Sequence, residues 1–209
     1  MNLNERIIST TIQMLMQMGV SSMTMDAIAK SCGISKRTLY EHFPDKLTLV
    51  TEALHHKNAA HQKELERIFN EAPNGIDALL RVYAEVRKQI TQTSMALVCD
   101  IKRLYPSLYN EYEVMHQQNT QALIDILRKA RTEGMVRDDA SIEISVMLFN
   151  MSMRDPELTQ LSYSHDIPLR KILDTLFINF LRAIASNSGL ELIDEFISKE
   201  ITENKIENK

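Results

Sequence analysis

The stretch TMDAIAKSCGISKRTLYEHFPDKLTLV, residues 24–50, decides the fold of the N-terminal part of the chain. It predicts two short helices joined by a tight turn at Gly33, because glycine readily adopts the left-handed conformation that such a turn requires. Thr24 and Ser35 stand where a hydroxyl group caps the first turn of a helix. The stretch therefore predicts a helix-turn-helix, whose second helix buries one face and presents the other to the major groove of DNA.

The two faces of this motif differ in chemistry. The face predicted to be buried contains Ile28, Ala29, Ile34, Leu39 and Phe43. The opposite face of the second helix is rich in donors that contact bases and phosphates, namely Ser35, Lys36, Arg37, Thr38, Tyr40 and His42. Lys46 opens the next helix near the same surface, and the free backbone N–H groups near Thr24 and Lys46 are suited to phosphate.

The motif resembles the N-terminal signature of the TetR/AcrR family of regulators. The residues that carry the resemblance are Thr24, Ile28-Ala29, Gly33-Ile34-Ser35, Leu39-Tyr40, His42-Phe43, Lys46 and Leu49. The resemblance implies phosphate contacts by Thr24, Lys36, Tyr40, His42 and Lys46, and base contacts by Lys36, Arg37, Thr38 and Tyr40. Two positions depart from the family pattern: Cys32 replaces a small alanine, and Lys36-Arg37 brings positive charge where small residues are frequent, which favours guanine contacts.

Apolar periodicity and the few glycine and proline residues predict helices in the rest of the chain. We expect helices over residues 1–19, 24–32, 35–43, 46–71, 76–93, 95–104, 107–133, 140–153, 168–186 and 190–201. The predicted fold is all-α. A three-helix helix-turn-helix head (residues 1–46) precedes a helical ligand-binding and dimerisation bundle (residues 47–201), and residues 202–209 form a disordered tail.

Charge and cysteine content restrict the class of protein. The net charge is −4, but residues 1–60 contain six Lys and Arg against five Asp and Glu, so the predicted head is the mildly basic part. The two cysteines, Cys32 and Cys99, lack the spacing of a metal site and suit a reducing compartment. We find no signal-peptide pattern and no apolar stretch long enough to span a bilayer, so we expect a cytoplasmic protein with no membrane partner.

A single helix-turn-helix makes few base contacts, so we expect a homodimer on a pseudo-palindromic DNA operator. Two nearly all-apolar helices near the C-terminus are the predicted interface, because a helix that is apolar all round must be covered on both sides. The predicted interface residues are Ile142, Val146, Phe149, Leu173, Phe177, Phe180 and Ile184. The family resemblance implies that these helices pair with their symmetry mates as a four-helix bundle.

The resemblance also implies a pocket for an unidentified small-molecule effector. Its predicted lining consists of Tyr83, Arg87, Met95, Cys99, Arg103, Tyr109, Tyr112 and His116. We expect a repressor that is released when the effector favours a DNA-incompetent conformation, in which the long helix from Lys46 swings and separates the two heads. Methionine and aromatic side chains at helical spacing are, however, also typical of an ordinary core.

Two alternatives remain at this point. Glu52-x-x-His55 and Glu113-x-x-His116 have the spacing of a di-iron helical bundle, although such a site needs two further inward carboxylates. A redox-responsive regulator acting through Cys99 is the other alternative. The sequence contains neither a Ser/His/Asp constellation nor a glycine-rich phosphate loop, so we expect no catalytic residue, no enzyme activity, no bound metal and no cofactor.

Overall fold

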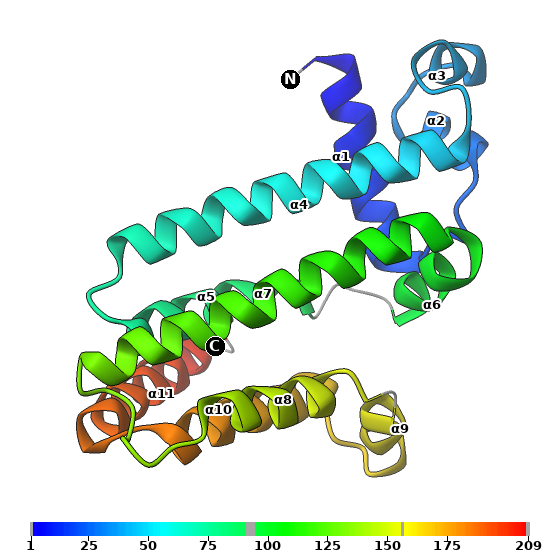
Figure 1. Ribbon diagram of the computed structural model, residues 1–209. Coiled ribbons are helices and arrows are strands. Elements are labelled where there is room, and N and C mark those ends of the chain that lie inside the picture. Colours follow the sequence, from blue (N-terminus) through cyan, green and yellow to red (C-terminus); the bar gives the residue numbers. More distant parts are fainter. Residues whose placement is uncertain (1, 91–94, 156, 208–209) are drawn as a thin grey trace. The chain divides into compact units, whose positions relative to one another are not determined.

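A computed structural model describes residues 2–90, 95–155 and 157–207, and every named element in these ranges is an α-helix (Figure 1). Within the described residues, the β-structure is limited to an isolated antiparallel bridge between Val136 and Ala185. The structure confirms the predicted all-α class, with a helix-turn-helix at the N-terminus and a helical C-terminal region.

The first four helices begin and end close to the predicted residues. They are α1 (Leu3–Met18), α2 (Met25–Ser31), α3 (Lys36–His42) and α4 (Lys46–Glu71). Asn2 caps α1 through a reciprocal pair of hydrogen bonds with Glu5, each 2.9 Å long. Gly19, at φ 73°, ends α1 at the predicted position.

The remaining helices differ from the prediction at two places. They are α5 (Gly75–Ile90), α6 (Met95–Leu104), α7 (Pro106–Thr132), α8 (Ile142–Met153), α9 (Glu157–Ser164), α10 (Leu169–Ile184) and α11 (Asn187–Glu207). Helix α9 was not predicted, because its eight residues include the exposed Leu161 and Tyr163 and form no regular apolar stripe. Helix α11 continues to Glu207, so residues 202–207 extend the helix instead of forming the frayed tail that we expected.

Gly189 does not break the chain as expected but lies buried within α11. A Cβ atom at this position would lie 2.2 Å from the carbonyl oxygen of Met135 and 3.1 Å from the Cβ of Ala185. The same carbonyl oxygen accepts a hydrogen bond from the backbone N–H of Ser186, 3.0 Å away. The glycine is therefore required by close packing of two backbone segments and not by a turn.

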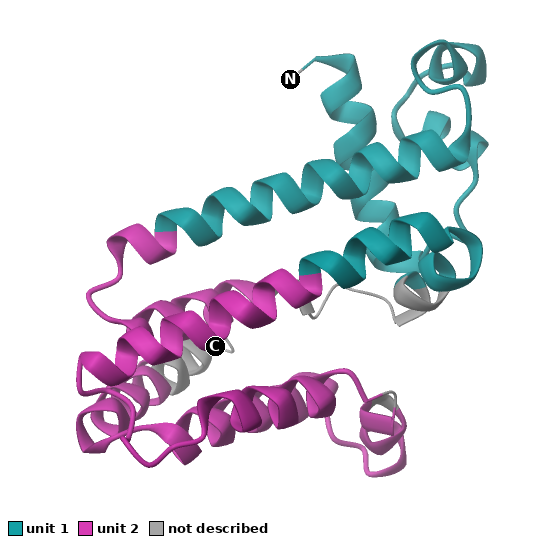
Figure 2. Ribbon diagram, in the orientation of Figure 1, with its two compact units in different colours: residues 1–67, 89–115 teal, residues 68–88, 116–209 magenta. Residues whose placement is uncertain are grey.

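The chain forms two compact units (Figure 2). Unit 1 consists of residues 1–67 and 89–115, and unit 2 of residues 68–88 and 116–209. This division differs from the linear boundary after residue 46 that the sequence suggested, because α6 and the first part of α7 belong with the helix-turn-helix. Leu97 of α6 and Leu108 of α7 are buried in the same apolar cluster as Ile7, Ile28 and Leu39.

Unit 2 has its own apolar core, in which α8 and α10 pack against each other. Most of the predicted dimer residues lie in this core: Ile142, Val146, Leu173, Phe177, Phe180 and Ile184 are buried, and Phe149 is half-buried. The ring of Phe149 stacks on Phe180 at a centroid distance of 4.4 Å. These side chains therefore stabilise the subunit itself, and their part in a dimer contact stays a prediction.

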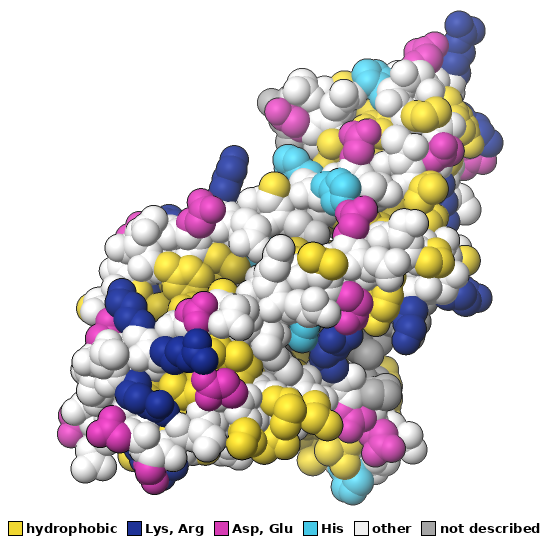
Figure 3. All heavy atoms as spheres, in the orientation of Figure 1, with side chains coloured by type: hydrophobic (Ala, Val, Ile, Leu, Met, Phe, Trp, Pro, Cys, Tyr) yellow, Lys and Arg dark blue, Asp and Glu magenta, His cyan; other side chains and the backbone are white. Residues whose placement is uncertain are grey.

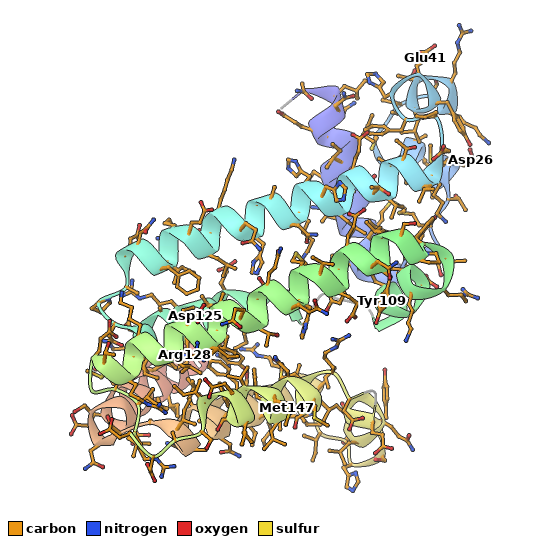
Figure 4. The ribbon with its side chains drawn as sticks, in the orientation of Figure 1. Asp26, Glu41, Tyr109, Asp125, Arg128 and Met147 are labelled. Atoms are coloured by element: carbon orange, nitrogen blue, oxygen red, sulfur yellow. The ribbon has the colours of Figure 1, made fainter. Side chains whose placement is uncertain are left out.

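A different set of α8 side chains is exposed. Ile144, Met147, Leu148 and Met151 have exposed fractions of 55%, 53%, 55% and 65%. Figure 3 shows hydrophobic side chains gathered over α8, and Figure 4 labels Met147 among them. We call these four residues the α8 face. Among the described residues, no helix is long and apolar enough to cross a membrane.

Candidate DNA-binding surface and ligand cavity

The turn between α2 and α3 has the geometry that the sequence predicted. Gly33 adopts φ 63°, and its N–H donates to the carbonyl oxygen of Lys30 at 3.1 Å. The N–H of Ile34 donates to the carbonyl oxygen of Ala29 at 3.0 Å. These two bonds form a Schellman motif, which ends α2 and turns the chain directly into α3.

Both predicted caps are present. The Thr24 hydroxyl accepts from the N–H of Ala27 at 3.1 Å, and the Ser35 hydroxyl accepts from the N–H of Thr38 at 3.0 Å. Ile28, Ala29, Leu39 and Phe43 are at most 3% exposed, while Ile34 packs partly against the same cluster. The buried face of the motif is thus confirmed, and it fixes which side of α3 faces solvent.

The solvent face of α3 displays Lys36, Arg37 and Tyr40. Their exposure is large: 58% and 90% for the side chains of Lys36 and Arg37, and 42% for Tyr40. The Nζ atom of Lys36 lies 6.0 Å from the centroid of the Tyr40 ring. His42 is also exposed, and Thr38 is half-buried with its Oγ1 2.8 Å from the Ser35 hydroxyl oxygen.

Each of the two cations on α3 has an acidic partner. Lys36 Nζ lies 2.8 Å from Oδ1 of Asp26 on α2, and Arg37 Nε lies 3.0 Å from Oε1 of Glu41. Figure 4 labels both acidic residues. The hydrogen bond to Asp26, followed by the attraction of its charge, raises the pKa of Lys36 above its ordinary value. The positive charge of this surface is therefore partly compensated before any DNA is bound.

Lys46 has a different environment from the other predicted phosphate ligands. Its Nζ donates to the carbonyl oxygen of Val20 at 2.6 Å, and the residue is half-buried. Burial lowers the pKa of Lys46, and the nearby negative charge of Asp100 partly offsets this effect. The ammonium group thus connects the start of α4 to the turn between α1 and α2 by a hydrogen bond. The spacing of residues in the sequence did not indicate this contact.

Unit 1 also contains a cavity of about 360 Å³ between α1, α4, α6 and α7. It is lined by Met16, Leu54, His55, Lys57, Asn58, Leu97, Ile101, Leu108, Tyr109, Glu111, Tyr112 and Met115. The lining is mainly apolar, and the Tyr109 and Tyr112 ring centroids lie 6.2 Å apart. Polar groups include the pair of His55 Nε2 and Glu111 Oε2, 2.8 Å apart, and Lys57, whose pKa burial lowers.

Residues 7–53, which span the helix-turn-helix and its supporting helices, match the family described as "Bacterial regulatory proteins, tetR family". Over these residues the chain is similar to the TetR family of regulators. It is 24% identical over 181 residues to YvaF of Bacillus subtilis (strain 168), an uncharacterised HTH-type transcriptional regulator, covering 84% of this chain and 94% of YvaF. The matching region and this relative both support a DNA-binding transcriptional regulator.

Solved structures of similar fold extend the likeness to the rest of the chain. A TetR-family regulator from Agrobacterium tumefaciens matches with a TM-score of 0.73 at 13% identity, covering 88% of this chain and 98% of that one. A transcriptional regulator from Saccharomonospora viridis, solved in complex with choline, matches with a TM-score of 0.72 at 16% identity, with the same coverage. At these identities the likeness concerns the fold.

The six predicted pocket residues whose side chains are described lie at four places. Tyr109 and Tyr112 line the cavity, whereas Arg103 bonds to Ser21 and Asp100. Tyr83 and Arg87 both contact Asp174 in unit 2, where burial, followed by the hydrogen bond to Asp174, raises the pKa of Tyr83. His116 lines a separate groove between α7 and α8, and the side chains of Met95 and Cys99 lie outside the described residues.

The residues of α4 that line the cavity were not predicted from the sequence. Leu54, His55 and Asn58 follow one another at one- and three-residue steps along α4, a spacing that places Leu54 and Asn58 on one helix face. This spacing was the available signal. The predicted lining begins at Tyr83 and therefore does not include this helix.

The di-iron alternative finds no support in the described residues. There, no group of three or more His, Cys, Asp or Glu side chains could hold a metal ion. His55 is instead paired with Glu111 of α7. The redox alternative concerns Cys99, whose side chain is not described, while Cys32 is buried in the core of unit 1.

Proposed function

We propose that this chain is a repressor of the TetR family that binds a pseudo-palindromic operator as a homodimer and is released by a small molecule. The observation that carries the DNA-binding part is the solvent face of α3, where Lys36, Arg37 and Tyr40 project from a helix fixed by buried Leu39 and Phe43. Arginine and lysine suit guanine edges and phosphates, and tyrosine suits phosphates.

The test is binding of the purified protein to the DNA upstream of its own gene, followed by selection from a random DNA pool. Wild type is compared with Tyr40→Ala and Arg37→Ala, and with Tyr163→Ala as the control. Tyr163 is 84% exposed on α9 of unit 2 and lies outside the proposed surface. We expect binding that weakens steeply with salt and falls about tenfold or more in the Tyr40 and Arg37 variants only. If neither DNA source yields a bound sequence, the DNA-binding proposal is wrong.

The α8 face is the proposed dimer contact. Its four side chains are exposed by half or more, and a contiguous apolar surface of this kind on a soluble protein marks an interaction site. The predicted pairing of α8 and α10 with their symmetry mates is thus retained as a proposal, but with different contact residues. A two-fold contact also fits a two-fold operator.

The cavity in unit 1 is the proposed effector site. Its apolar lining favours a small, mainly apolar molecule whose few polar groups meet Tyr109, Tyr112 or the His55–Glu111 pair. The choline found in the Saccharomonospora viridis regulator supports the idea that this fold holds small molecules. Because α4 lines the cavity and Lys46 starts α4, a molecule that shifts this helix also moves its connection to α3.

A thermal-shift screen of small molecules tests the effector site, with each stabilising compound then added to the operator-binding assay. We expect a true effector to weaken operator binding and to lose this effect in Tyr112→Ala. Linkage requires the reciprocal result, so saturating operator DNA should weaken the compound's binding by the same factor. A compound that binds in the cavity without changing operator affinity contradicts ligand release.

A further inference from the structure

Asp100 of α6 is one of two buried polar or charged residues, with Thr11, found in the described part of the chain. Thr11 has a local partner, since its hydroxyl donates to the carbonyl oxygen of Ile7 at 2.8 Å. Asp100 instead bonds to Ser21, far away in the sequence, between α1 and α2. Burying a carboxylate costs free energy unless hydrogen bonds or opposite charges compensate for the lost water, so the partners of Asp100 determine what this residue does in the fold.

The carboxylate holds the turn between α1 and α2 by two bonds. The backbone N–H of Ser21 donates to Oδ2 of Asp100 at 2.6 Å, and the Ser21 hydroxyl donates to Oδ1 at 2.5 Å. Arg103 closes the cluster, because its Nη2 donates to the Ser21 hydroxyl oxygen at 3.0 Å and to Oδ1 of Asp100 at 3.2 Å. These bonds lower the pKa of Asp100, the largest cause being the Ser21 hydroxyl.

The same turn is held from the other side by the helix-turn-helix. Lys46, the first residue of α4, donates to the carbonyl oxygen of Val20, the residue before Ser21. Val20 is fully buried, and its carbonyl oxygen also accepts from the N–H of Met23 at 3.2 Å. The turn therefore lies between Asp100 of α6 and Lys46 of α4, and it leads directly into the cap of α2 at Thr24.

The helix that carries Asp100 also forms a wall of the cavity. Leu97 and Ile101 line it, and they lie three residues before and one residue after Asp100. Helix α6 packs against α1 as well. A rigid helix with one face on a cavity and a buried carboxylate on the turn can transmit a small displacement from one to the other.

We infer that Asp100 is a positioning residue for DNA binding: it fixes the turn at Ser21, and through Lys46 the start of α4, so that α2 and α3 keep the orientation that DNA requires. A molecule in the cavity that displaces α6 pulls the carboxylate away from Ser21 and loosens the motif. The effect of a molecule in the cavity rests on the proposed effector site, whereas the role of Asp100 in holding the turn at Ser21 does not.

The experiment compares Asp100→Ala, Asp100→Asn, Ser21→Ala and the double variant Asp100→Asn/Ser21→Ala in the full chain. Asp100→Asn keeps an acceptor oxygen for the Ser21 N–H but loses the charge. Asp125→Asn is the control, since it removes an equal charge from an exposed pair with Arg128 in unit 2. Operator affinity is measured well below the unfolding temperature, and amide hydrogen exchange is followed at Ser21 and over the first turn of α4.

We expect operator affinity to fall about tenfold or more in Asp100→Ala and by less in Asp100→Asn, because hydrogen bonds to charged groups contribute more than neutral ones. Exchange should accelerate at Ser21 and at the start of α4 but not in unit 2. The double variant should lose less than the two single losses combined, since both substitutions remove the same contact. Asp125→Asn should behave as wild type.

Lower thermal stability with unchanged operator affinity and unchanged exchange at the start of α4 would show a purely structural carboxylate and overturn the inference. If Asp100→Ala does not fold, the operator affinity and the hydrogen exchange of Asp100→Asn and Ser21→Ala test the inference instead. If wild type binds no selected DNA, the proposed function has failed. The exchange pattern then still decides whether Asp100 positions the motif.

Discussion

On α3, adjacent side chains of opposite charge set the strength of the DNA-facing surface. Asp26 and Glu41 bind Lys36 and Arg37 at 2.8 Å and 3.0 Å, and all four side chains are more than half exposed. Exposed pairs of this kind contribute little to stability, so they are readily exchanged for another partner. DNA phosphates compete for the same cations, and the acidic residues consequently reduce affinity for any DNA sequence.

We therefore expect Asp26→Asn to bind both operator and random DNA more tightly, by roughly two- to fivefold. If the freed Lys36 takes a further phosphate, the slope of log affinity against log salt should steepen by up to about 0.9. Fluorescence anisotropy at several salt concentrations measures both quantities. Asp125→Asn, which breaks a comparable exposed pair in unit 2, should leave them unchanged. An unaltered slope and affinity in Asp26→Asn would contradict the competition.

The role of individual residues was only partly predictable. Gly33, Thr24 and Ser35 act locally, so their turn and caps could be read from the neighbouring sequence. The role of Lys46 could not be read in this way, because its partner Val20 lies 26 positions away. The ammonium group contacts the backbone oxygen of Val20, so the type of side chain at position 20 does not indicate the contact. The spacing of residue types along the sequence does not predict long-range contacts to the backbone.

Among the helices, those bounded by clear stop signals in the sequence were predicted best. Helix α4 begins and ends at the predicted residues, Lys46 and Glu71, because Pro44-Asp45 and Pro73 bound it. Helix α11 starts earlier than predicted because a glycine within a helix and a glycine after its end look alike in one sequence. The oxygen of Met135, from a distant segment, distinguishes the two cases at Gly189.

This close approach makes Gly189→Ala a specific test of α11. The added methyl group would lie 2.2 Å from a carbonyl oxygen, so a backbone segment must move. Although alanine favours helix, we expect the free energy of unfolding to fall by about 1–3 kcal/mol, the usual cost of overpacking. Urea unfolding followed by circular dichroism measures it. The neighbouring Ser188, which is exposed on the same helix, provides the control Ser188→Ala. Equal or higher stability of Gly189→Ala would contradict this packing.

For the whole molecule, the structure adds which apolar side chains of α8 are covered within the subunit. The sequence predicted that a helix that is apolar all round is covered on both sides, without saying which residues contact the subunit core and which a partner chain. In the structure, Ile142 and Val146 are buried in the core of unit 2, whereas Met147 and Leu148 are exposed. Sequence periodicity could not separate the two faces, because both are equally apolar.

If the α8 face forms the dimer, Met147→Glu should place a charge at the centre of the contact. We expect a monomer by sedimentation at micromolar concentration and a loss of operator affinity of about a hundredfold or more, since two linked half-sites no longer bind together. Val114→Glu is the matched control, because Val114 of α7 is 54% exposed, close to the 53% of Met147. A Met147→Glu protein that remains dimeric would assign the interface elsewhere.

The interleaved composition of unit 1 also affects how the protein is made. Its apolar cluster draws Leu97 and Leu108 from a stretch of chain that follows part of unit 2. On the ribosome, residues 1–67 emerge first and lack both leucines, as well as the carboxylate of Asp100 that binds Ser21. The DNA-binding motif therefore reaches its final packing only after Leu108 has been synthesised. A nascent chain that ends at residue 89 contains α3 and most of its apolar cluster, but it still lacks Leu97, Leu108 and the carboxylate of Asp100.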